Sequence, residues 1–494
     1  MFPGSSSWKG RLDSGKPGER GMRAGGGRSW NHVAGSNQTQ LRSKMSAPEE
    51  RTLAEEEEEE EAMDAAGSDE DGGDDMEEDG EAQRRVYVPG MEPLQPGEEL
   101  EMDRSAYRMY HECQTGAPCL SFDVLPDSDG SGREQFPLSM LLCAGTQADT
   151  ALKNRLLVMK MHNLHGTEKD KEESSDEESD EDEEEEDEDK KPQMELAMMP
   201  HYGGINRVRV TRVGERSLAA VWSEKGQVEI FDLRPQLEAV HSSAAMAAFV
   251  SEQKEASPLF SFSGHMAEGF AIDWSPKVPG RLVSGDCKKN IHVWEPREGG
   301  TSWQIDQRPF SSHSQSVEDL QWSPTEATVF ASCSVDQSIR IWDIRAPPNS
   351  MLSADEAHSS DINVISWNQT EPFLLSGGDD GILKVWDLRQ FKSGRPVANF
   401  KQHSAPITSV EWNPVDSSVF AASGADDVVS QWDLSVESCD VGARVEGVKD
   451  LPPQLLFLHQ GQSELKEVHW HPQIPGVMVS TALSGFNVFR TISV

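Results

Sequence analysis

Histidine, serine and aspartate residues recur along the chain at spacings that could build a proton relay of the kind used by serine hydrolases. His313, Ser332 and Asp336 form one such set, and Trp342 follows it. A hydrolytic triad activates one serine in one cleft, whereas this set returns in successive segments of the chain. Further members at matching positions are Asp380, Asp426 and Ser376. The repetition favours a structural role for these residues over catalysis.

Other signatures of catalysis are missing from the sequence. It contains no glycine-rich phosphate loop and no nucleophile elbow. His469 and His471 form an i, i+2 pair on an expected strand, which is too few ligands for a zinc site, so we interpret both as packed histidines. We therefore expect a protein that is not an enzyme and that needs no cofactor and no metal.

The repeat unit runs from a histidine, through an apolar strand that ends in tryptophan, to a strand that closes in Trp-Asp or a relative of it. In four copies the interval from histidine to closing tryptophan is 28 or 29 residues, at 265–294, 313–342, 358–386 and 403–432. Two weaker copies span 30 residues, at 201–231 and 459–489, and a seventh fits strands near 119–125, 137–145 and 154–161. The pattern is typical of WD repeats. Seven units close a ring and remove open sheet edges between units.

The predicted fold class is therefore all-β: a seven-bladed WD-repeat β-propeller with an N-terminal helix and disordered acidic tracts. In such repeats the indole N–H of the closing tryptophan needs a partner, and an aspartate six residues earlier holds the histidine. Asp336 stands at that position before Trp342. The third copy differs, because Lys288 occupies the position and Asp286 is displaced by two residues. We expect a looser turn there.

Charge is distributed very unevenly along the 494 residues, whose formal net charge is −41. Residues 45–82 hold 19 acids and one base, and residues 168–189 hold 17 acids and two lysines. Residues 1–44 are basic, with eight bases and two acids. Runs of like charge repel one another and bury no apolar surface, so both acidic tracts are expected to be disordered. Their field attracts basic partners and disfavours direct contact with nucleic acid.

These shifts in composition predict the domain organisation. A disordered basic extension without function of its own covers 1–44, and a disordered acidic tail covers 45–85. An N-terminal segment, 86–118, carries a helix near 98–112. The propeller covers 119–494 and contains a disordered acidic insertion at 164–192. A loop insertion at 434–456 lies between the sixth and seventh repeats.

The cysteines and the hydropathy pattern indicate a soluble protein of a reducing compartment. The six cysteines follow no CxxC or paired spacing, so we expect packed thiols rather than disulfides. They are Cys113, Cys119, Cys143, Cys287, Cys333 and Cys439. No apolar run approaches the roughly 18–20 residues of a membrane span, and no signal peptide opens the chain.

Three segments, 264–276, 317–322 and 451–459, give the chain a more specific resemblance. They are similar to the histone-binding retinoblastoma-binding and chromatin-assembly family of WD-repeat propellers. With the acidic tracts included, the chain from about residue 86 onward resembles the glutamate-rich members of that family. The resemblance implies core histones as partners, nuclear, nucleolar or chromatin localisation, and no membrane.

The resemblance also implies a groove between the N-terminal helix and a proline loop, in which a basic histone helix docks. Leu100, Tyr107 and Tyr110 recur at spacings of seven and three, which would give the predicted helix one apolar face. The loop side of the groove consists of Asp450, Leu451, Pro452, Pro453 and Leu455. An apolar cleft rimmed by acids suits a basic amphipathic helix. The alternative is that the helix only seals the ring and the insertion is an ordinary loop.

A second surface implied by the resemblance is one mouth of the central channel. Four carboxylates that stand shortly after the histidines of their repeats are expected to rim it: Glu268, Glu318, Asp361 and Glu467. Such a ring could hold arginine or lysine side chains of an extended tail through charge-assisted hydrogen bonds. The alternative is a solvated acidic rim.

The acidic tracts are expected to recruit basic clients while the propeller supplies a defined contact; solubility alone is the alternative. Four serines lie among acids, in the context that an acidophilic kinase prefers, so we expect phosphorylation of Ser68, Ser174, Ser175 and Ser179. Each phosphate would add about 1.5 to 2 negative charges.

Three functions fit these features. The first is a histone-binding chaperone acting on chromatin, and the second is an escort for a basic ribosomal protein during ribosome assembly, with pre-ribosomes as partners. The third is a substrate receptor that binds the adaptor of a cullin–RING ubiquitin ligase. Arg345 and Arg389 indicate the third, because each completes a Trp-Asp-x-Arg motif of the kind found in such receptors.

Overall fold

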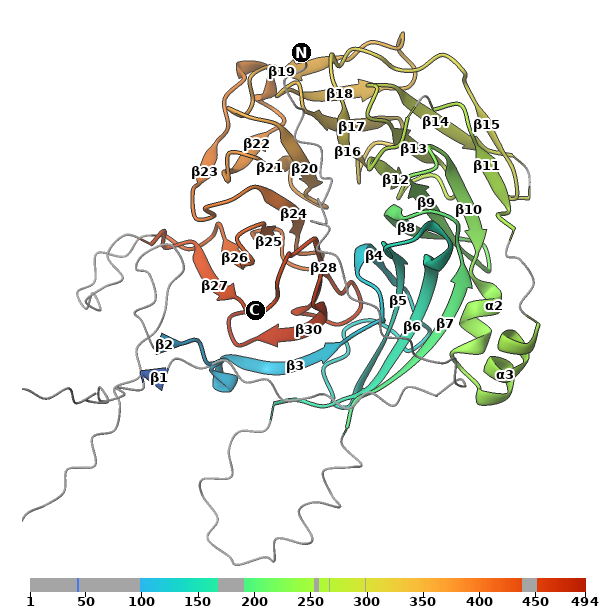
Figure 1. The fold of residues 1–494 in the computed structure, drawn as a ribbon. Helices are drawn as coiled ribbons and strands as arrows, with labels where there is room; N and C mark the ends of the chain where they lie inside the picture. Colours follow the sequence, from blue (N-terminus) through green and yellow to red (C-terminus); the bar gives the residue numbers. More distant parts are fainter. Residues whose placement is uncertain are drawn as a thin grey trace, which may run out of the picture. The chain divides into compact units, whose positions relative to one another are not determined.

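The computed structural model describes residues 42–43, 98–167, 191–252, 257–265, 267–297, 299–437 and 451–494. In these ranges the chain forms seven four-stranded antiparallel sheets, which stand as blades around a common axis (Figure 1). The predicted seven-bladed propeller is thereby confirmed. Both acidic tracts, Asp450 and Cys439 lie outside the described residues, and so do Ser68, Ser174, Ser175 and Ser179. No described helix is long and apolar enough to cross a bilayer.

The first four blades each follow the order of the chain from the innermost to the outermost strand. Blade 1 contains β4 (Cys119–Leu125), β5 (Leu138–Thr146), β6 (Arg155–Leu164) and β7 (Gln193–Pro200). Blade 2 contains β8 (Ile205–Val213), β9 (Arg216–Ser223), β10 (Val228–Asp232) and β11 (Phe260–Phe262). Blade 3 contains β12 (Ile272–Trp274), β13 (Leu282–Gly285), β14 (Ile291–Pro296) and β15 (Trp303–Ile305). Blade 4 contains β16 (Val317–Trp322), β17 (Val329–Ser334), β18 (Ile339–Asp343) and β19 (Leu352–Ala354).

The last three blades complete the ring. Blade 5 contains β20 (Ile362–Trp367), β21 (Phe373–Gly378), β22 (Leu383–Asp387) and β23 (Ala398–Phe400). Blade 6 contains β24 (Ile407–Trp412), β25 (Val419–Gly424), β26 (Val429–Asp433) and β27 (Leu455–His459). Blade 7 contains β28 (Glu467–Trp470), β29 (Val477–Ala482), β30 (Gly485–Thr491) and β3 (Tyr107–Cys113).

A few short elements lie outside the blades. The helices α2 (Arg234–Ala239) and α3 (Ser243–Ser251) lie between β10 and β11. Short 3-10 turns are η1 (Arg104–Ala106), η2 (Ala151–Lys153) and η3 (Phe391–Ser393). The two-residue strands β1 (Arg42–Ser43) and β2 (Glu98–Glu99) pair with each other.

The N-terminal segment is a strand where a helix was predicted. Residues 107–113 form β3, the outermost strand of blade 7, which pairs with β30 near the end of the chain. The prediction of a helix near 98–112 is therefore wrong, and the propeller begins at Tyr107 rather than at residue 119. Blade 7 has only three strands of its own, so the N-terminal strand supplies the missing fourth and joins the two ends of the ring (Figure 1).

A β-bulge explains why the spacing of the aromatic residues was misleading. In a regular strand, residues three apart point to opposite faces. The register of β3 shifts between Tyr107 and Met109, so that Arg108 has no partner on β30. The shift turns Tyr110 back toward Tyr107, and their ring centroids lie 5.4 Å apart. Two aromatic residues three apart on one face are helical in spacing but strand in structure.

The inner strands pack against one another through side chains that accept backbone N–H groups. At five of the seven junctions the acceptor is a polar residue near the end of one inner strand, and it takes the N–H at the matching position of the next. The pairs are Asp123 with Val210, Asp273 with Trp322, Gln321 with Trp367, Ser366 with Trp412 and Glu411 with Trp470, at 2.6–3.1 Å. An unpaired buried N–H is costly, so these acceptors set the contact between blades.

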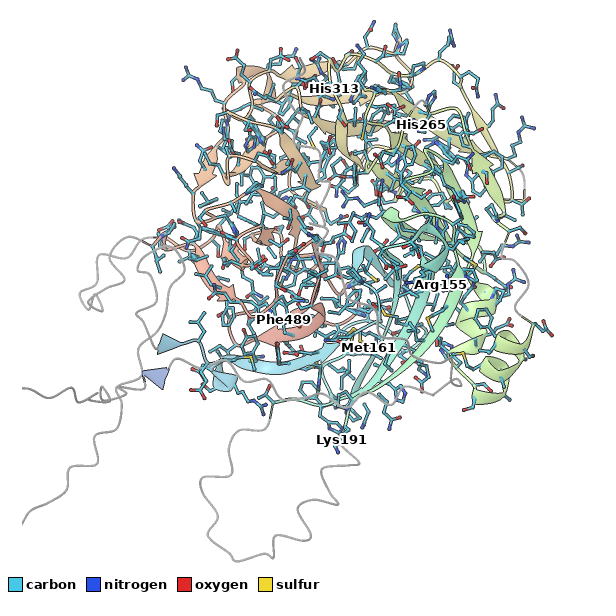
Figure 2. The ribbon with its side chains drawn as sticks, in the orientation of Figure 1. Arg155, Met161, Lys191, His265, His313 and Phe489 are labelled. Carbon is cyan, nitrogen blue, oxygen red and sulfur yellow. The ribbon has the colours of Figure 1, made fainter. Side chains whose placement is uncertain are left out.

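The expected relay from tryptophan through serine and histidine to aspartate is present in blades 4 and 5. In blade 4 the Trp342 indole N–H donates to Ser332 Oγ at 2.8 Å, and Ser332 Oγ lies 2.6 Å from His313 Nε2. His313 Nδ1 lies 3.0 Å from Asp336 Oδ2. Burial raises the pKa of Asp336, but the bond to His313 outweighs it and holds that pKa well below the usual range. Figure 2 labels His313 and its counterpart His265 in adjacent blades.

The turn of blade 3 is not looser, contrary to the prediction. Asp286, although displaced by two residues, lies 3.1 Å from His265 Nδ1, and Ser284 bridges His265 to Trp294. Asp286 also accepts the backbone N–H groups of Lys288 and Asn290 at 2.9 Å. The longer reach is possible because the aspartate caps its own turn and holds the histidine with its second oxygen.

Blade 6 completes its relay with a serine that sequence spacing does not identify. Ala422 occupies the position ten residues before Trp432, where blades 4 and 5 carry serine. Ser430 on β26 pairs directly with Ala422 across the sheet. Its Oγ accepts the Trp432 N–H and lies 2.8 Å from His403 Nε2. The hydroxyl has moved to the neighbouring strand and reaches the same place.

The two insertions occupy equivalent places in their blades. β6 ends at Leu164 and β7 begins at Gln193, so the acidic insertion joins the third and fourth strands of blade 1. β26 ends at Asp433 and β27 begins at Leu455, so the second insertion lies inside blade 6. Its placement between the sixth and seventh blades is therefore corrected. Because Leu455–His459 pairs with β26, the loop ends in a strand of its own blade.

The relay of blade 6 makes a testable prediction about stability. Ser430→Ala leaves the Trp432 N–H and His403 without their shared partner, so the free energy of unfolding should fall by about 1–3 kcal/mol. Adding Ala422→Ser should restore part of the loss, because it returns the hydroxyl to the position used in blades 4 and 5. Urea unfolding checks both, with exposed Ser128→Ala as the control. No loss in the single variant, or no recovery in the double, would contradict the relay.

Candidate binding surfaces of the ring

Tyr107 and Tyr110 meet the strand that follows the proline loop. The Tyr107 ring lies edge-on to Phe457 of β27, with centroids 5.3 Å apart, and its hydroxyl lies 2.8 Å from His459 Nδ1. Asn487 Nδ2 donates to the Tyr110 hydroxyl and to His459 Nε2, at 3.1 and 3.2 Å. The N-terminal segment and β27 therefore converge, as the resemblance implied, but through a strand instead of a helix.

The proton positions in this cluster follow from the amide. An Asn Nδ2 only donates, so His459 Nε2 accepts and Nδ1 carries the proton toward the Tyr107 oxygen. Burial lowers the pKa of His459 to about 3, which keeps the ring neutral. Burial also raises the pKa of Tyr107 well above its usual value. With 7% of its surface exposed, Tyr107 is a core residue that ties blade 7 to blade 6.

The remaining groove residues divide into core and surface. Leu455 packs against the core between blades 5 and 6, and its N–H donates to the Pro452 carbonyl at 3.0 Å. Leu100, Leu451 and Pro452 are partly exposed, and Pro453 is exposed. Of the eight predicted groove residues, the structure thus brings the two tyrosines to β27, leaves Leu100, Leu451, Pro452 and Pro453 accessible, and does not describe Asp450.

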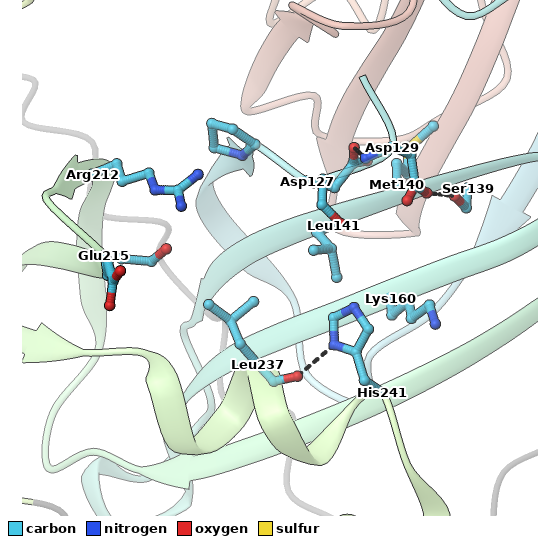
Figure 3. A pocket seen from close by; sticks show the side chains of 13 residues that line it. Asp127, Asp129, Ser139, Met140, Leu141, Lys160, Arg212, Glu215, Leu237 and His241 are labelled. Atoms are coloured by element: carbon cyan, nitrogen blue, oxygen red, sulfur yellow. Dashed lines mark hydrogen bonds between the residues drawn. The ribbon is translucent and has the colours of Figure 1, made fainter. Parts of the chain in front are cut away.

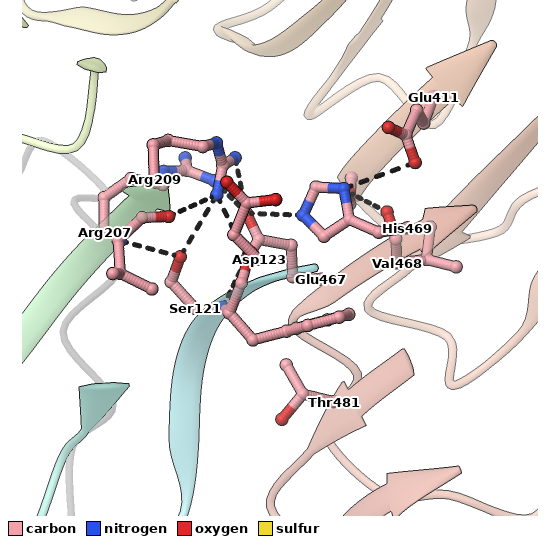
Figure 4. Close-up of polar contacts among 12 residues, drawn as sticks. Ser121, Asp123, Arg207, Arg209, Glu411, Glu467, Val468, His469 and Thr481 are labelled. Carbon is pink, nitrogen blue, oxygen red and sulfur yellow. Dashed lines mark hydrogen bonds and ion pairs between the residues drawn. The ribbon is translucent and has the colours of Figure 1, made fainter. Parts of the chain in front are cut away.

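Glu467 is the mouth carboxylate that the structure places differently from the prediction. Its side chain is only 1% exposed, and Oε1 lies 2.7 Å from Arg207 Nη1 and 2.7 Å from Arg209 Nη2 (Figure 4). Oε2 accepts the Phe122 N–H at 2.8 Å. Although burial raises the pKa of Glu467, the attraction of Arg209 outweighs it and holds that pKa well below the usual range. Glu467 is therefore used within the ring and is not free to bind a client.

The two arginines and His469 mark the two junctions without the usual acceptor. Arg209 and His469 stand where other inner strands carry Asp, Gln, Ser or Glu, and neither accepts the next blade's N–H. Instead both turn toward Glu467, which takes over the junction between blades 7 and 1 (Figure 4). Two basic residues in the degenerate strand 205–213, where its counterparts carry acids, are a signal that sequence reasoning missed.

The other three mouth carboxylates remain candidates. Glu268 is partly exposed, and its Oε2 accepts Asn206 Nδ2 at 3.3 Å. Burial raises the pKa of Glu318, and the nearby Asp361 adds to the rise. Burial and the charge of Asp379 likewise raise the pKa of Asp361. Negative charges held close together in this way favour the approach of a cation.

Arg345 and Arg389 are exposed but engaged locally. The Arg345 guanidinium takes the Asp343 carboxylate with Nε at 3.0 Å and Nη2 at 2.6 Å, and Arg389 holds Asp387 in the same way. The side chains remain 69% and 66% exposed. The Asp-x-Arg fork also occurs at Asp306 and Arg308, where no tryptophan precedes it. The fork is thus a local turn feature that leaves one face of each guanidinium open.

A hollow of about 310 Å³ lies between blade 1 and α2 (Figure 3). Lys160 and Arg212 line it together with Leu141, Leu237 and His241. Asp127 also lines it, but its carboxylate pairs with Arg133 at 2.6 Å. The described residues hold no group of three or more side chains suited to a metal ion.

Comparison with known proteins agrees with this geometry. A family model that describes the histone-binding protein RBBP4, or the corresponding component of the CAF1 complex, matches residues 97–165. The model of the WD domain, G-beta repeat, matches 305–343, 350–387 and 394–433. The ring of seven blades and its histidine relays define the chain as a WD-repeat β-propeller.

Three relatives narrow the assignment. The chain is 43% identical over 433 residues to protein HEAT STRESS TOLERANT DWD 1 of Arabidopsis thaliana, covering 83% of this chain and 92% of the relative. It is 42% identical over 430 residues to ribosome assembly protein rrb1 of Schizosaccharomyces pombe, covering 84% and 86%. It is 43% identical over 426 residues to glutamate-rich WD repeat-containing protein 1 of Dictyostelium discoideum, with the same coverage. The chain belongs to the glutamate-rich WD repeat-containing protein family.

The cluster around Glu467 predicts a loss of stability at alkaline pH. Burial lowers the pKa of His469, but Glu411 and Glu467 outweigh it and raise that pKa to about 10. Because the folded pKa is raised, the stabilisation is full below about pH 6.5, the unfolded value, and is lost as the pH rises toward 10. Chemical unfolding at a series of pH values should show a steeper decline for the wild type than for His469→Gln. Parallel declines would contradict the charge assigned to His469.

Proposed function

We propose that this chain is a chaperone-like binder of basic proteins, with core histones, a basic ribosomal protein or both as its clients. It acts by binding and not by catalysis, in chromatin dynamics or ribosome assembly, in the nucleus, the nucleolus or on chromatin. The match of a histone-binding family model to 97–165 supports a histone client. The relative named as a ribosome assembly protein supports a ribosomal one.

The observation that carries the proposal is the attachment of the second acidic tract. Residues 168–189 join β6 to β7, and these strands pair over eight residues of continuous register. The tract, with 17 acids and two lysines, is thereby anchored to one folded blade at both ends. A polyanion fixed beside a folded surface raises the local concentration of a cationic protein and speeds its encounter.

The ring supplies the defined part of the contact. Leu100 and Leu451 offer apolar surface near the junction of blades 6 and 7, and Glu268, Glu318 and Asp361 offer carboxylates at the channel mouth. Each contact between exposed charges is weak and screened by salt. Specific binding therefore requires the folded surface in addition to the tract. A pull-down at raised salt distinguishes the clients by whether histones or ribosomal proteins remain bound.

The division of labour predicts different kinetic effects for two changes. Deleting 168–189 should slow association with core histones about tenfold and flatten its salt dependence, because steering acts on the encounter. Leu451→Asp should mainly speed dissociation, because it disrupts a contact made only in the complex. Stopped-flow or surface measurements of both rates provide the test, with exposed Leu483→Asp as the control. Equal, purely electrostatic losses in both variants would contradict the proposal.

A second candidate function is that of a substrate receptor for a cullin–RING ubiquitin ligase. The exposed faces of Arg345 and Arg389 favour it, since each guanidinium keeps donors available beyond its own aspartate. Arg345→Ala with Arg389→Ala should abolish co-purification with the ligase adaptor while shifting the midpoint of unfolding by little. Exposed Arg308→Ala, which removes the same fork at Asp306, is the matched control. Unchanged adaptor binding in the double variant would exclude this function.

A further inference from the structure

The outermost strand of blade 1 is unusual among the outer strands of this ring. β7 has eight residues, whereas the outer strands of blades 2 to 5 have three each. β3 is also long, but it completes the ring itself. Among the residues that the structure describes, β7 pairs with β6 along one edge and with no strand along the other.

Long open edges are normally avoided, because their unpaired N–H and C=O groups accept a strand from another chain. Natural sequences blunt such edges with short strands, proline or lysine. The three-residue outer strands of blades 2 to 5 follow this rule. β7 has neither lysine nor proline between Gln193 and Met199, and proline appears only at its final position, Pro200.

One end of β7 is covered and the other is accessible. α2 contacts the strand, and Gln236 Nε2 lies 3.0 Å from Met199 Sδ. Ala197 and Met199 are buried in the core shared with α2 and α3. Gln193 and Met198 are exposed, Met198 by 41%, and the three residues between Gln193 and Ala197 are partly exposed. In Figure 1 the labels β4 to β7 follow one another outward, and Figure 2 labels Lys191 just before β7.

We propose that the Gln193–Met198 edge of β7 binds an extended segment of a basic client as an added strand. Alternate residues of an edge strand point their backbone groups outward, so this stretch offers about three sets of open N–H and C=O groups. An added strand would satisfy them and extend blade 1 from four strands to five, in the mode of β-augmentation.

The side chains of β7 define the chemistry of the occupant. Met194, Leu196 and Met198 lie on one face of the strand, and apolar residues of an added strand would pack beside them. Glu195 lies on the other face, 41% exposed, and favours lysine or arginine opposite it. The acidic tract enters β7 directly, and its charge also selects cations. The segment that fits is therefore extended and alternates apolar with basic residues.

This inference rests on the proposed preference for basic clients and adds a site and a conformation to it. The probe is a synthetic eight-residue peptide that alternates valine and lysine, with blocked ends, titrated against the full chain by fluorescence anisotropy. Two derivatives carry N-methyl groups on the odd or on the even residues. One pattern removes the N–H groups that face β7, and the other removes those that face solvent. One derivative should lose at least about tenfold in affinity, and the other should bind within about twofold of the parent.

A pair of protein variants locates the site. Met198→Lys places a charge on the edge and should weaken peptide binding about threefold to tenfold. Met351→Lys, the same change at a residue 56% exposed beside the three-residue β19, should leave it unchanged. Thermal melts confirm that both variants fold, and the N-methyl comparison needs no variant at all.

The outcomes separate this inference from the proposed function. Equal binding of both N-methyl derivatives, with affinity that falls with salt, would overturn strand addition and leave electrostatic client binding intact. No preference for the lysine peptide over its glutamate counterpart would overturn both. Self-association of the chain that Met198→Lys abolishes would show a second copy to be the occupant of the edge, and would overturn the assignment to a client.

Discussion

The backbone N–H groups of the inner strands impose the constraint on which this ring depends. Each buried N–H at a blade junction needs an acceptor, and five junctions supply it from one residue of the preceding inner strand. At the two junctions where Arg209 and His469 replace that acceptor, Glu467 draws both bases together and takes the N–H of Phe122. The lining of the channel is therefore polar for a structural reason, and a carboxylate that looks available for ligands is already used.

A ring held in this way is a rigid body on which binding surfaces can be displayed. Insertions leave it between the third and fourth strands of blades 1 and 6, where they disturb neither the junctions nor the histidine relays. The acidic tract is thus added to the propeller without cost to its core. The same reasoning separates the two roles in client binding: long-range attraction comes from the tract, and shape comes from surfaces that the junctions hold in place.

The sequence was sufficient for features that repeat and insufficient for features that depend on pairing. Regular intervals between His313 and Trp342 and their counterparts predict seven blades, because each interval spans one unit. Ser430 escaped detection because its hydroxyl reaches the relay from a cross-strand neighbour. The N-terminal strand was mistaken for a helix because a bulge at Arg108 imitates helical spacing. Arg207 lies 260 residues from Glu467 in the chain, and only closure of the ring brings them together.

The central claim is that the folded ring itself contacts a basic client after the tract has attracted it. Hydrogen–deuterium exchange of the full chain, with and without core histones at a salt concentration that screens attraction between exposed charges, tests this most directly. The account predicts slower exchange in defined strands of the propeller while the complex persists. A stable complex in which no segment of 107–165 or 193–494 exchanges more slowly would contradict it.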